Sequence, residues 1–400
     1  MTDPALPASP AGHGEPVVIL KIARRSRHPW IYRRMIVKPD RPLPAGAIVR
    51  IVDRDGKMAG RGHYHPTSQI ALRVLTDRDE AVDLGFFRRR LEAAVRLRRD
   101  VLRLDDVTDA WRIVHSEADG LSGLIVDRYG STIVMEFHSR AMHAWRAEWE
   151  TLLREAFPGA TVIGRAGARV EQREEFRCEP LPEGKPVTIT ESGLKFLVDP
   201  GGGHKTGFFI DQRDTRRALT PLVRGRRVLD CCCYTGAFSI YAAGPGGAKE
   251  VVGVDLDEKA IARARDNARL NGSRVNWVHS DVFGYLRGRG PDAPKFDVVI
   301  LDPPKWIGSK EEFPEGYRNH ADMNRLALGV LAPGGLLVTC TCSGLMGEEE
   351  FTGLVHRAAS QAGRRLQLLE RRGAAPDHPV AMDCPETRYL QVMILRAEVD

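Results

Sequence analysis

Short apolar runs separated by turn residues dominate residues 17–83. The runs VVILKI, AIVRIVD and QIALRVL are rich in β-branched residues, and the turns PAG, RDGK and HPTS lie between them. This pattern is typical of short strands, so we expect a small all-β barrel over residues 17–85. Residues 1–16, MTDPALPASPAGHGEP, lack the basic and apolar segments of a signal peptide and are expected to form a flexible leader.

A helical period replaces the short strands after residue 85. In FFRRRLEAAVRLRRDVL (86–102) the apolar residues recur at helical spacing, and arginines occupy the other face. Two strand-like runs follow within WRIVHSEADGLSGLIVDRYGSTIVMEF, and then a helical segment, AMHAWRAEWETLLREAF. These features predict a central α+β domain over residues 86–190.

The last part of the chain, residues 191–400, repeats strand, turn and helix. The apolar runs RRVLDCC, EVVGVDL, VNWVHSD, FDVVILD and GGLLVTCTC are candidate strands, and helix-like segments such as EKAIARARDNARLNG separate several of them. Continuous apolar strands that alternate with helices indicate a parallel sheet covered on both faces. We therefore predict an α/β, doubly wound, Rossmann-like domain here.

Composition and charge narrow the class of protein. Of the 400 residues, 42% are hydrophobic and 28% charged, which is ordinary for a globular chain and excludes a fibre, a disordered protein or a polytopic membrane protein. Seven cysteines, three of them adjacent, do not form a disulfide framework, so we expect a cytoplasmic protein. From Lys21 to Arg103 there are 21 basic and 9 acidic residues, a net charge of +12, whereas the rest carries −6. This asymmetry favours nucleic-acid binding, although a solvated arginine-rich surface would look the same.

Ligands of doubly wound sheets bind beyond the carboxyl ends of the strands. The first predicted strand leads into a loop with one glycine, DCCCYTGAF, instead of the G-x-G-x-x-G of dinucleotide sites. Asp255 and Asp281 end the second and third strands, where carboxylates can reach the ribose hydroxyls and the adenine amino group of an adenosine. Either residue alone could equally be a helix cap, as we expect for Asp257. The whole series fits S-adenosylmethionine better than a dinucleotide.

Two further strand ends carry candidate catalytic groups. Asp302 precedes two prolines, so it is held on a rigid, extended backbone and can hydrogen-bond the amide-like edge of a base; a plain turn is the alternative. Cys342 ends the fifth strand and is a candidate nucleophile, or else a small packing residue. The sequence C-x-C has no second Cys/His pair at ligand spacing, so we expect no metal site.

Several motifs together resemble the bacterial large-subunit rRNA cytosine-C5 methyltransferases of the 23S rRNA methyltransferase I type. They are RHPWIY (27–32), SEADGLSGLIVDRYG (116–130), GHKTGFFIDQRDTR (203–216), CCCYTGAF (231–238), LDPPKW (301–306), CTCSGLM (340–346) and DHPV (377–380). The resemblance covers about residues 17–395. It implies an N-terminal PUA domain, a small central domain, a C-terminal class I methyltransferase domain, S-adenosylmethionine as cofactor and rRNA as substrate.

The resemblance also implies roles for individual residues. Cys342 matches the nucleophile and Asp302 the base-contacting acid, while Asp255 and Asp281 match the ribose and adenine contacts. The matches to the donor loop and to the segment that closes over the donor are Tyr234, Gly236, Gln212 and Arg213.

This sequence departs from the family at Cys233, where a serine is usual, and at Cys340, often an apolar position. The base that removes the C5 proton is not identified, because Pro303-Pro304-Lys305 follows the acid where related enzymes place a second cysteine.

Two other functions remain open at this point. Methylation of an adenine amino group also uses a strand-end acid or amide before Pro-Pro, but it prefers an aromatic residue where this chain has Lys305. A non-catalytic RNA-binding protein with a relic methyltransferase fold is the third interpretation, and the intact acids and Cys342 count against it. The target nucleotide and the oligomeric state, a homodimer included, are left open.

Overall fold

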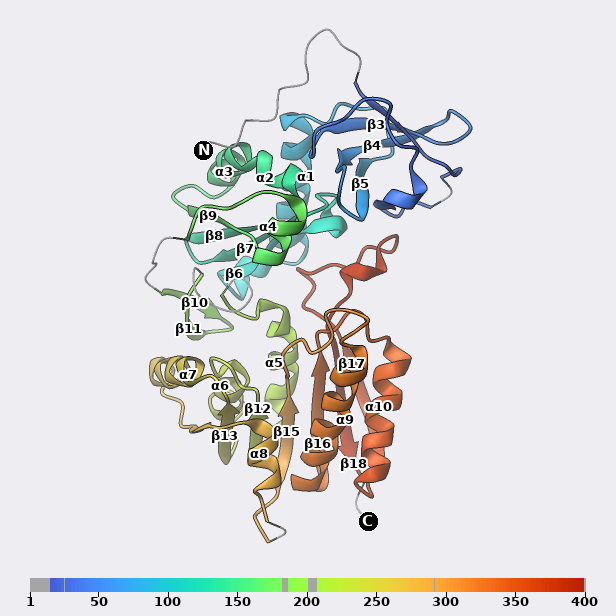
Figure 1. Cartoon of the computed structure of the whole chain (residues 1–400). Helices are drawn as coiled ribbons and strands as arrows, with labels where there is room; N and C mark the ends of the chain where they lie inside the picture. Colours follow the sequence, from blue (N-terminus) through green and yellow to red (C-terminus); the bar gives the residue numbers. More distant parts are fainter. Residues whose placement is uncertain (1–14, 25, 182–185, 201–206, 291, 399–400) are drawn as a thin grey trace. The chain divides into compact units, whose positions relative to one another are not determined.

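A computed structural model describes residues 15–24, 26–181, 186–200, 207–290 and 292–398 (Figure 1). The predicted leader, except for residues 15 and 16, and the first part of the GHKTGFFIDQR segment lie outside the described residues. The chain forms two compact units. The first comprises residues 1–189, 198–210 and 376–387, and the second comprises residues 190–197, 211–375 and 388–400.

A five-stranded sheet occupies the start of the first unit, with the strand order β1-β3-β4-β5-β2. Its strands are β1 (Val17–Ile19), β2 (Trp30–Tyr32), β3 (Ile48–Val52), β4 (Met58–Tyr64) and β5 (Ile70–Thr76). The strands expected from the three apolar runs are confirmed, whereas β2 and β4 escaped prediction. Strand β4 has two glycines, and the backbone of β5 passes so close to Gly62 that a Cβ there would lie 2.1 Å from the carbonyl oxygen of Arg73.

A second sheet of the first unit has the order β6-β7-β8-β9. Its strands are β6 (Ala110–His115), β7 (Leu124–Tyr129), β8 (Thr132–Phe137) and β9 (Thr161–Arg165), and its helices are α1 (Leu84–Arg96), α2 (Arg140–Ala144), α3 (Arg146–Ala156) and α4 (Ala168–Glu174). Asp83 caps α1 by accepting the Phe86 N–H at 2.8 Å, a stabilising contact at a helix N-terminus. The predicted central α+β arrangement is therefore present.

One hydrophobic cluster joins the two sheets of this unit. Leu75 of β5 and Val82, which precedes α1, pack in the same buried cluster as Phe86 and Phe87 of α1 and Trp149 of α3. The ring centroids of Phe87 and Trp149 are 5.0 Å apart. A truncation at residue 85 would therefore expose apolar side chains, so point substitutions are the better probe of the N-terminal module.

The second unit contains a seven-stranded sheet in the order β14-β13-β12-β15-β16-β18-β17. Its strands are β12 (Arg227–Cys231), β13 (Glu250–Asp255), β14 (Asn276–His279), β15 (Phe296–Leu301), β16 (Leu331–Thr341), β17 (Leu366–Arg372) and β18 (Gln391–Ala397). The first five are parallel, as predicted, but β18 runs antiparallel to both β16 and β17. The sheet is thus mixed, because the two strands after the last helix, β17 and β18, form an antiparallel pair, and β18 of this pair lies next to β16.

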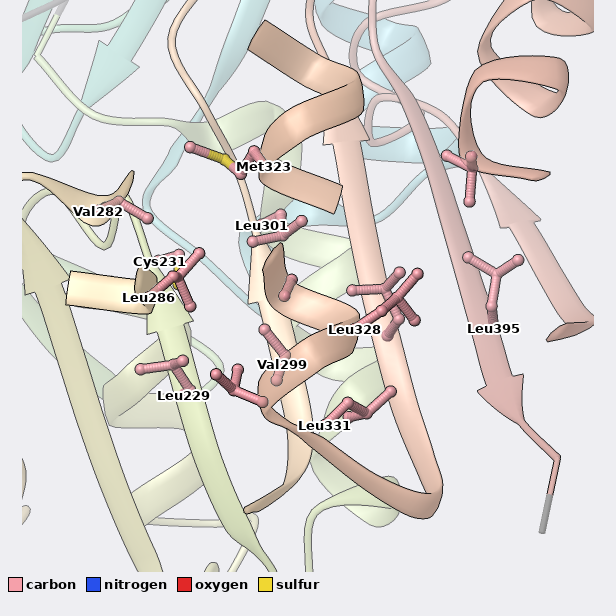
Figure 2. Packing of buried hydrophobic residues seen from close by; sticks show 14 of the residues in the cluster. Leu229, Cys231, Val282, Leu286, Val299, Leu301, Met323, Leu328, Leu331 and Leu395 are labelled. Atoms are coloured by element: carbon pink, nitrogen blue, oxygen red, sulfur yellow. The ribbon is translucent and has the colours of Figure 1, made fainter. Parts of the chain in front are cut away.

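Helices cover both faces of this sheet, which explains its continuous apolar strands. They are α5 (Arg213–Leu219), α6 (Ala237–Ala243), α7 (Glu258–Leu270), α8 (Val282–Arg287), α9 (Phe313–Val330) and α10 (Glu348–Gln361). In strand β15, Val299 and Leu301 pack with α8, α9 and α10, while Val298 and Ile300 pack with α5 and α6. Figure 2 shows the first of these layers, with Leu328 of α9 among its labelled residues.

The remaining described elements are short. They are the hairpin β10 (Val187–Glu191) and β11 (Leu194–Val198), a π turn at Leu97–Val101, and the 3-10 turns Arg33–Met35, Leu104–Asp106, Ser116–Asp119, Ile210–Gln212, Thr220–Leu222 and Pro385–Thr387. Among the helices that the structure describes, none is both long and apolar enough to cross a membrane.

Candidate active site

The loop between β12 and α6 is held in an unusual backbone conformation. Cys232 and Tyr234 have φ values of 60° and 48°, in the left-handed region that non-glycine residues rarely adopt. Gly236 has φ 83°, and a Cβ there would lie 2.4 Å from Cη2 of Trp277. Such strain collects at ligand sites, where the surrounding structure maintains it. Only glycine lets the loop come this close to the indole.

Asp255 ties the end of β13 to this loop. One of its carboxylate oxygens accepts the Tyr234 N–H at 2.7 Å and the other accepts the Asp257 N–H at 2.9 Å. The side chain is half-buried, and each carboxylate oxygen can accept a second hydrogen bond. The predicted position at a strand end beside the donor loop is therefore what the structure has, and lone pairs remain for a ligand.

Both other strand-end acids in this region cap helices. Asp257 accepts the Lys259 and Ala260 N–H groups at 2.8 and 3.1 Å, which confirms its predicted role as the cap of α7. Asp281 accepts the Gly284 N–H at 2.7 Å and caps α8, and its side chain is exposed. The capping alternative thus applies to Asp281, and its adenine contact stays a prediction that must use the remaining lone pairs.

Asp302 lies at the end of β15 with Gln212 beside it. The Gln212 Nε2 donates to Asp302 Oδ1 at 3.2 Å, because a carboxylate requires the donor end of the amide. Gln212 is buried, and its Oε1 has no hydrogen-bond partner among the described residues. The structure therefore brings Gln212 to Asp302, whereas the resemblance placed Gln212 only in the segment that closes over the donor.

The two cysteines at the end of β16 differ in exposure. Register pairs Leu301 with Thr339, so Asp302 and Cys340 are the next residues along the two strands. Cys340 is fully buried; burial and Asp302 raise the pKa of its thiol well above the usual range, and the Gln212 amide opposes them. Cys342 follows the strand, is half-buried and packs at the edge of the same cluster as Cys340. The thiols thus share one face, and only Cys342 is partly accessible.

The third cysteine of interest, Cys233, is also unsuited to react with a large substrate. It is 6% exposed. Burial raises the pKa of its thiol well above the usual range, and the neighbouring carboxylates of Asp230 and Asp255 raise it further.

Comparison with known proteins identifies the family. A family model of S-adenosylmethionine-dependent methyltransferases matches residues 117–394, and a PUA-like domain model matches residues 22–77. The chain is 42% identical over 382 residues to the ribosomal RNA large subunit methyltransferase I of Aeromonas hydrophila, covering 93% of this chain and 96% of the relative. It is 38% identical over 400 residues to the Klebsiella pneumoniae protein of the same name, covering 98% of each. The chain belongs to this family of S-adenosylmethionine-dependent methyltransferases.

Solved structures agree on the fold of the methyltransferase. SMU.776, a methyltransferase crystallised with SAH, superposes with a TM-score of 0.80 at 21% identity, covering 92% of this chain and 96% of that one. A SAM-dependent methyltransferase from Streptococcus mutans superposes with a TM-score of 0.79 at 19% identity, covering 95% and 100%. Together with the family models, they confirm the predicted class I methyltransferase fold, the PUA-like domain and S-adenosylmethionine as cofactor.

The residues of this methyltransferase fit that cofactor. The strained loop lies at the carboxyl end of β12, and Gly236 leaves room where any other side chain would strike Trp277. Asp255 presents its half-buried carboxylate next to that loop, and the apolar side chain of Leu256 beside it is 66% exposed. These features suit a ligand with a hydroxylated sugar and a flat apolar ring.

Sequence reasoning missed the acid beneath the loop. Asp230 is fully buried and accepts both the N–H, at 3.0 Å, and the hydroxyl, at 2.7 Å, of Ser239. Burial raises the pKa of Asp230 to about 7, and Asp302 and Asp255 add to the rise, while the bonds from Ser239 oppose it. Asp230 is visible in the sequence LDCC, but its place in an apolar run suggested only a strand residue.

His320 of α9 was also missed. Its Nε2 lies 3.3 Å from Thr341 Oγ1, and its ring packs edge-on against Trp306 with centroids 4.7 Å apart. Burial lowers the pKa of His320 to about 4, so the ring is neutral at pH 7. It supports both the Pro-Pro segment and the last residue of β16. No local sequence signal marks it, because the contact joins residues far apart in the chain.

Arg213 lies at the start of α5, away from any exposed surface. Its side chain is buried, and its Nε is 3.5 Å from Asp214 Oδ1. The nearby Arg216 forms a buried two-point ion pair with Glu191 at 2.9 and 2.8 Å, and Tyr241 donates to the same carboxylate. This network anchors α5, which begins directly after Gln212. The contact of Arg213 with the donor stays a prediction.

One group of metal-ligand type occurs among the described residues, outside this site. His28, Cys384 and Glu386 place one ligand atom each within 4.8 Å of one another. However, His28 Nδ1 accepts the Trp30 N–H at 3.1 Å, so Nε2 keeps its proton and donates to Glu386 at 3.0 Å. Burial raises the pKa of the Cys384 thiol to about 12. The three groups thus satisfy one another as a hydrogen-bonded chain.

Proposed function

We propose that this methyltransferase forms 5-methylcytosine in large-subunit rRNA, through a covalent bond between Cys342 and carbon 6 of the cytosine. The relatives that share about 40% of its residues are named ribosomal RNA large subunit methyltransferase I. That name supports the substrate class. The choice of cytosine and of carbon 5 rests on the pairing of a thiol with an acid at neighbouring strand ends.

The observation that carries the proposal is the position of Cys342 relative to Asp302. Carbon 5 of cytosine is a weak nucleophile, and a thiolate that adds to carbon 6 makes it enamine-like. Cys342 is half-buried and directly follows β16, and Asp302 directly follows the neighbouring strand β15. Asp302 would accept a hydrogen bond from the exocyclic amine with one oxygen and, with a proton on the other, donate to N3 and so stabilise the negative charge that addition moves onto the ring. Once carbon 5 carries the methyl group, a base removes the C5 proton, and the electrons of that bond expel the Cys342 thiolate from carbon 6 and restore the ring.

S-adenosylmethionine supplies the electrophilic methyl group. Asp255 would accept the ribose hydroxyls, Asp281 the adenine amino group, and the backbone of Tyr234 and Gly236 would line the donor. Gln212 would orient Asp302 through the 3.2 Å hydrogen bond. The target base must leave its stack to reach a pocket at strand ends, and the basic N-terminal half would hold the RNA backbone.

A mechanism-based adduct tests this proposal. RNA that carries 5-fluorocytidine at the target should remain attached to the wild-type protein under denaturing conditions, because fluorine cannot leave as a proton. Peptide mass mapping should place the adduct on residues 340–346, and Cys342→Ala should form none. Cys340→Ala and Cys233→Ala are the matched controls, since both thiols are buried, and they should keep the adduct and substantial activity.

The product distinguishes the rival functions. A methyl group on carbon 5 of cytosine in rRNA, absent from a deletion strain, supports the proposal. Methylation of an exocyclic amine, or full activity of Cys342→Ala, contradicts it, and the first of these results favours an adenine or other amino-methylating enzyme. RNA binding with no methyl transfer under any condition would identify an RNA-binding protein with a relic fold.

A further inference from the structure

The first unit has a hollow of about 740 Å³ that the methyl-transfer site does not use. Its walls come from the loop before β2, the end of β5 and the turn after it, helix α1, the 3-10 turn near residue 118, and residues 381 and 383. The five arginines of its lining are Arg24, Arg27, Arg78, Arg89 and Arg90. This size accommodates a nucleotide-sized group.

Two of the acids in the lining are already neutralised from outside it. Glu117 accepts hydrogen bonds from Trp30 at 2.8 Å and from Arg73 at 3.3 Å. Asp119 accepts two from Arg98, at 2.6 and 2.9 Å. Because neither Arg73 nor Arg98 lines the hollow, these carboxylates do not cancel the charge of the lining arginines.

Arg24 is a half-buried cation without an ion-paired carboxylate among the described residues. Its guanidinium donates to backbone carbonyls, to Ser26 at 3.1 Å, to His28 at 3.3 Å and to Ala59. Burial lowers the pKa of Arg24, while the more distant Asp77 and Asp383 oppose that shift. These carbonyls orient the guanidinium but do not neutralise its charge, so a bound anion would supply the missing counter-charge.

Arg90 is held rigidly over the same hollow. It donates to the Leu75 carbonyl at 3.3 Å, and its guanidinium lies 5.1 Å from the centroid of the buried Phe86 ring. On another side it meets Gly120, where an added Cβ would lie 3.2 Å from Arg90 Nη1. A guanidinium fixed in this way loses little freedom when it binds a planar or tetrahedral anion.

The remaining three arginines stand around these two. Arg27 meets Asp77 at 3.5 Å with its side chain 81% exposed, a pair of little strength. Arg89 forms an ion pair with Glu80 at 3.1 Å. Arg78 is exposed and has no ion pair within the described residues. The hollow therefore presents three guanidinium groups, on Arg24, Arg78 and Arg90, that have no carboxylate bound to them.

We infer that this hollow binds the phosphodiester backbone of the RNA substrate, with Arg24 and Arg90 as fixed anion contacts and Arg78 at the opening. The inference rests on the proposed function, which makes RNA the substrate. The guanidinium fork matches phosphate oxygens in two-point contacts. The five arginines of the lining also belong to the segment with a net charge of +12, so long-range attraction and local contacts act together.

The test compares two variants with the same loss of charge. Arg78→Gln/Arg90→Gln removes two groups of the hollow and leaves the half-buried Arg24 in place. The control, Arg88→Gln/Arg154→Gln, removes two arginines of the same unit that pair with Glu155 and Glu150 and do not line the hollow. Melting temperature and donor affinity should match wild type in both variants.

For the hollow variant we expect RNA affinity to fall about tenfold or more near 0.15 M salt. The slope of log K against log salt should become shallower by roughly 0.7–0.9 for each phosphate that the variant no longer neutralises. The Michaelis constant for RNA should rise, while turnover at saturating RNA stays at the wild-type value. The control variant should remain within about twofold of wild type.

Equal RNA affinity and salt slope in the two variants would overturn the inference. Inorganic phosphate, titrated at constant ionic strength, provides a second arm. If the hollow variant loses phosphate binding but keeps RNA binding, the hollow is a free-anion site and the inference is wrong. In both cases the wild type still methylates RNA, so the proposed function stands. A wild type that neither binds nor methylates RNA would remove the proposed function itself.

Discussion

The strand-end site of the second unit and the arginine hollow of the first use opposite charges for opposite ligands. Four aspartates, Asp230, Asp255, Asp281 and Asp302, follow or end parallel strands of the site, where the proposed ligands offer hydroxyl, amino and sulfonium groups. Arginines gather in the hollow, where the proposed ligand is a polyanion. The comparison teaches that each region suits one kind of recognition: under the two proposals, the acids would serve the chemistry and the arginines the attachment of RNA.

The two regions also hold their charged groups by different means. In the site, backbone N–H groups hold the carboxylates of Asp255 and Asp281 at 2.7–2.9 Å. In the hollow, backbone carbonyls and an aromatic ring hold Arg24 and Arg90 without neutralising them. A substitution in one region should therefore alter one function and leave the other unchanged.

The largest effect is expected at the nucleophile. Cys342→Ala should lower methyl transfer by about 10³-fold or more, because it removes the covalent step. Donor and RNA affinity should stay within about twofold of wild type, as measured by calorimetry and filter binding. An equally large loss of RNA affinity in Cys342→Ala would contradict the assignment of methyl transfer and RNA binding to separate regions.

The next largest effect concerns the loop glycine of the site. Gly236→Ala should strain a residue with φ 83° and push its Cβ to within 2.4 Å of the Trp277 ring. Left-handed backbone costs an alanine about 1–2 kcal/mol, and overpacking adds about 1–3 kcal/mol. We expect a lower melting temperature and a donor affinity reduced by tenfold or more. Retained donor affinity would show that the loop does not contact the donor.

Asp230 should give the site a pH dependence of stability. Its pKa of about 7 exceeds the ordinary value of 3.8, so the folded state holds a proton that the unfolded state releases between about pH 4 and 7. The free energy of unfolding therefore loses this contribution as pH rises through that window. The side chain of Asp230→Asn does not titrate. In urea titrations, the free energy of unfolding of this variant minus that of wild type should therefore increase from pH 5 to pH 7 and then stay constant. A constant difference across this range would contradict the prediction.

Asp255→Ala should weaken the donor contact without straining the backbone of the loop. Hydrogen bonds to a charged group are worth about 1.5–3 kcal/mol, so the dissociation constant for S-adenosylmethionine should rise about 10- to 150-fold. Because Asp255 also accepts the Tyr234 and Asp257 N–H groups, a modest fall in melting temperature should accompany it. An unchanged dissociation constant in the folded variant would remove Asp255 from the donor site.

The smallest effect is expected in the hollow. Gly120→Ala places a Cβ 3.2 Å from Arg90 Nη1 at a residue with φ 67°, and the strain should cost about 1–2 kcal/mol. Since the arginine can shift by a few tenths of an ångström, RNA affinity should fall only severalfold while donor affinity stays constant. A change in donor affinity without a change in RNA affinity would reverse the assignment of the two regions.

Local pattern was enough to predict much of this molecule. Alternating apolar runs and turn residues predicted β1, β3 and β5 and the five parallel strands of the second unit, because strand burial is written directly into side-chain type. It also marked Asp255, Asp281, Asp302 and Cys342 as strand-end residues, since the carboxyl ends of parallel strands share one edge. The resemblance then supplied the cofactor, which composition and spacing only favoured over a dinucleotide.

Other features depend on contacts between distant residues, and only the tertiary structure decided them. Strand β4 was not predicted, and the close passage of β5 explains its glycines; the antiparallel pairing of β18 with β16 is likewise visible only in the folded sheet. Gln212 meets Asp302 across 90 positions of sequence, and the environment that raises the pKa of Asp230 is built by several elements at once. Hydrophobic period is a property of one segment, but hydrogen-bond partners, desolvation and the gathering of charges around a hollow exist only when segments meet.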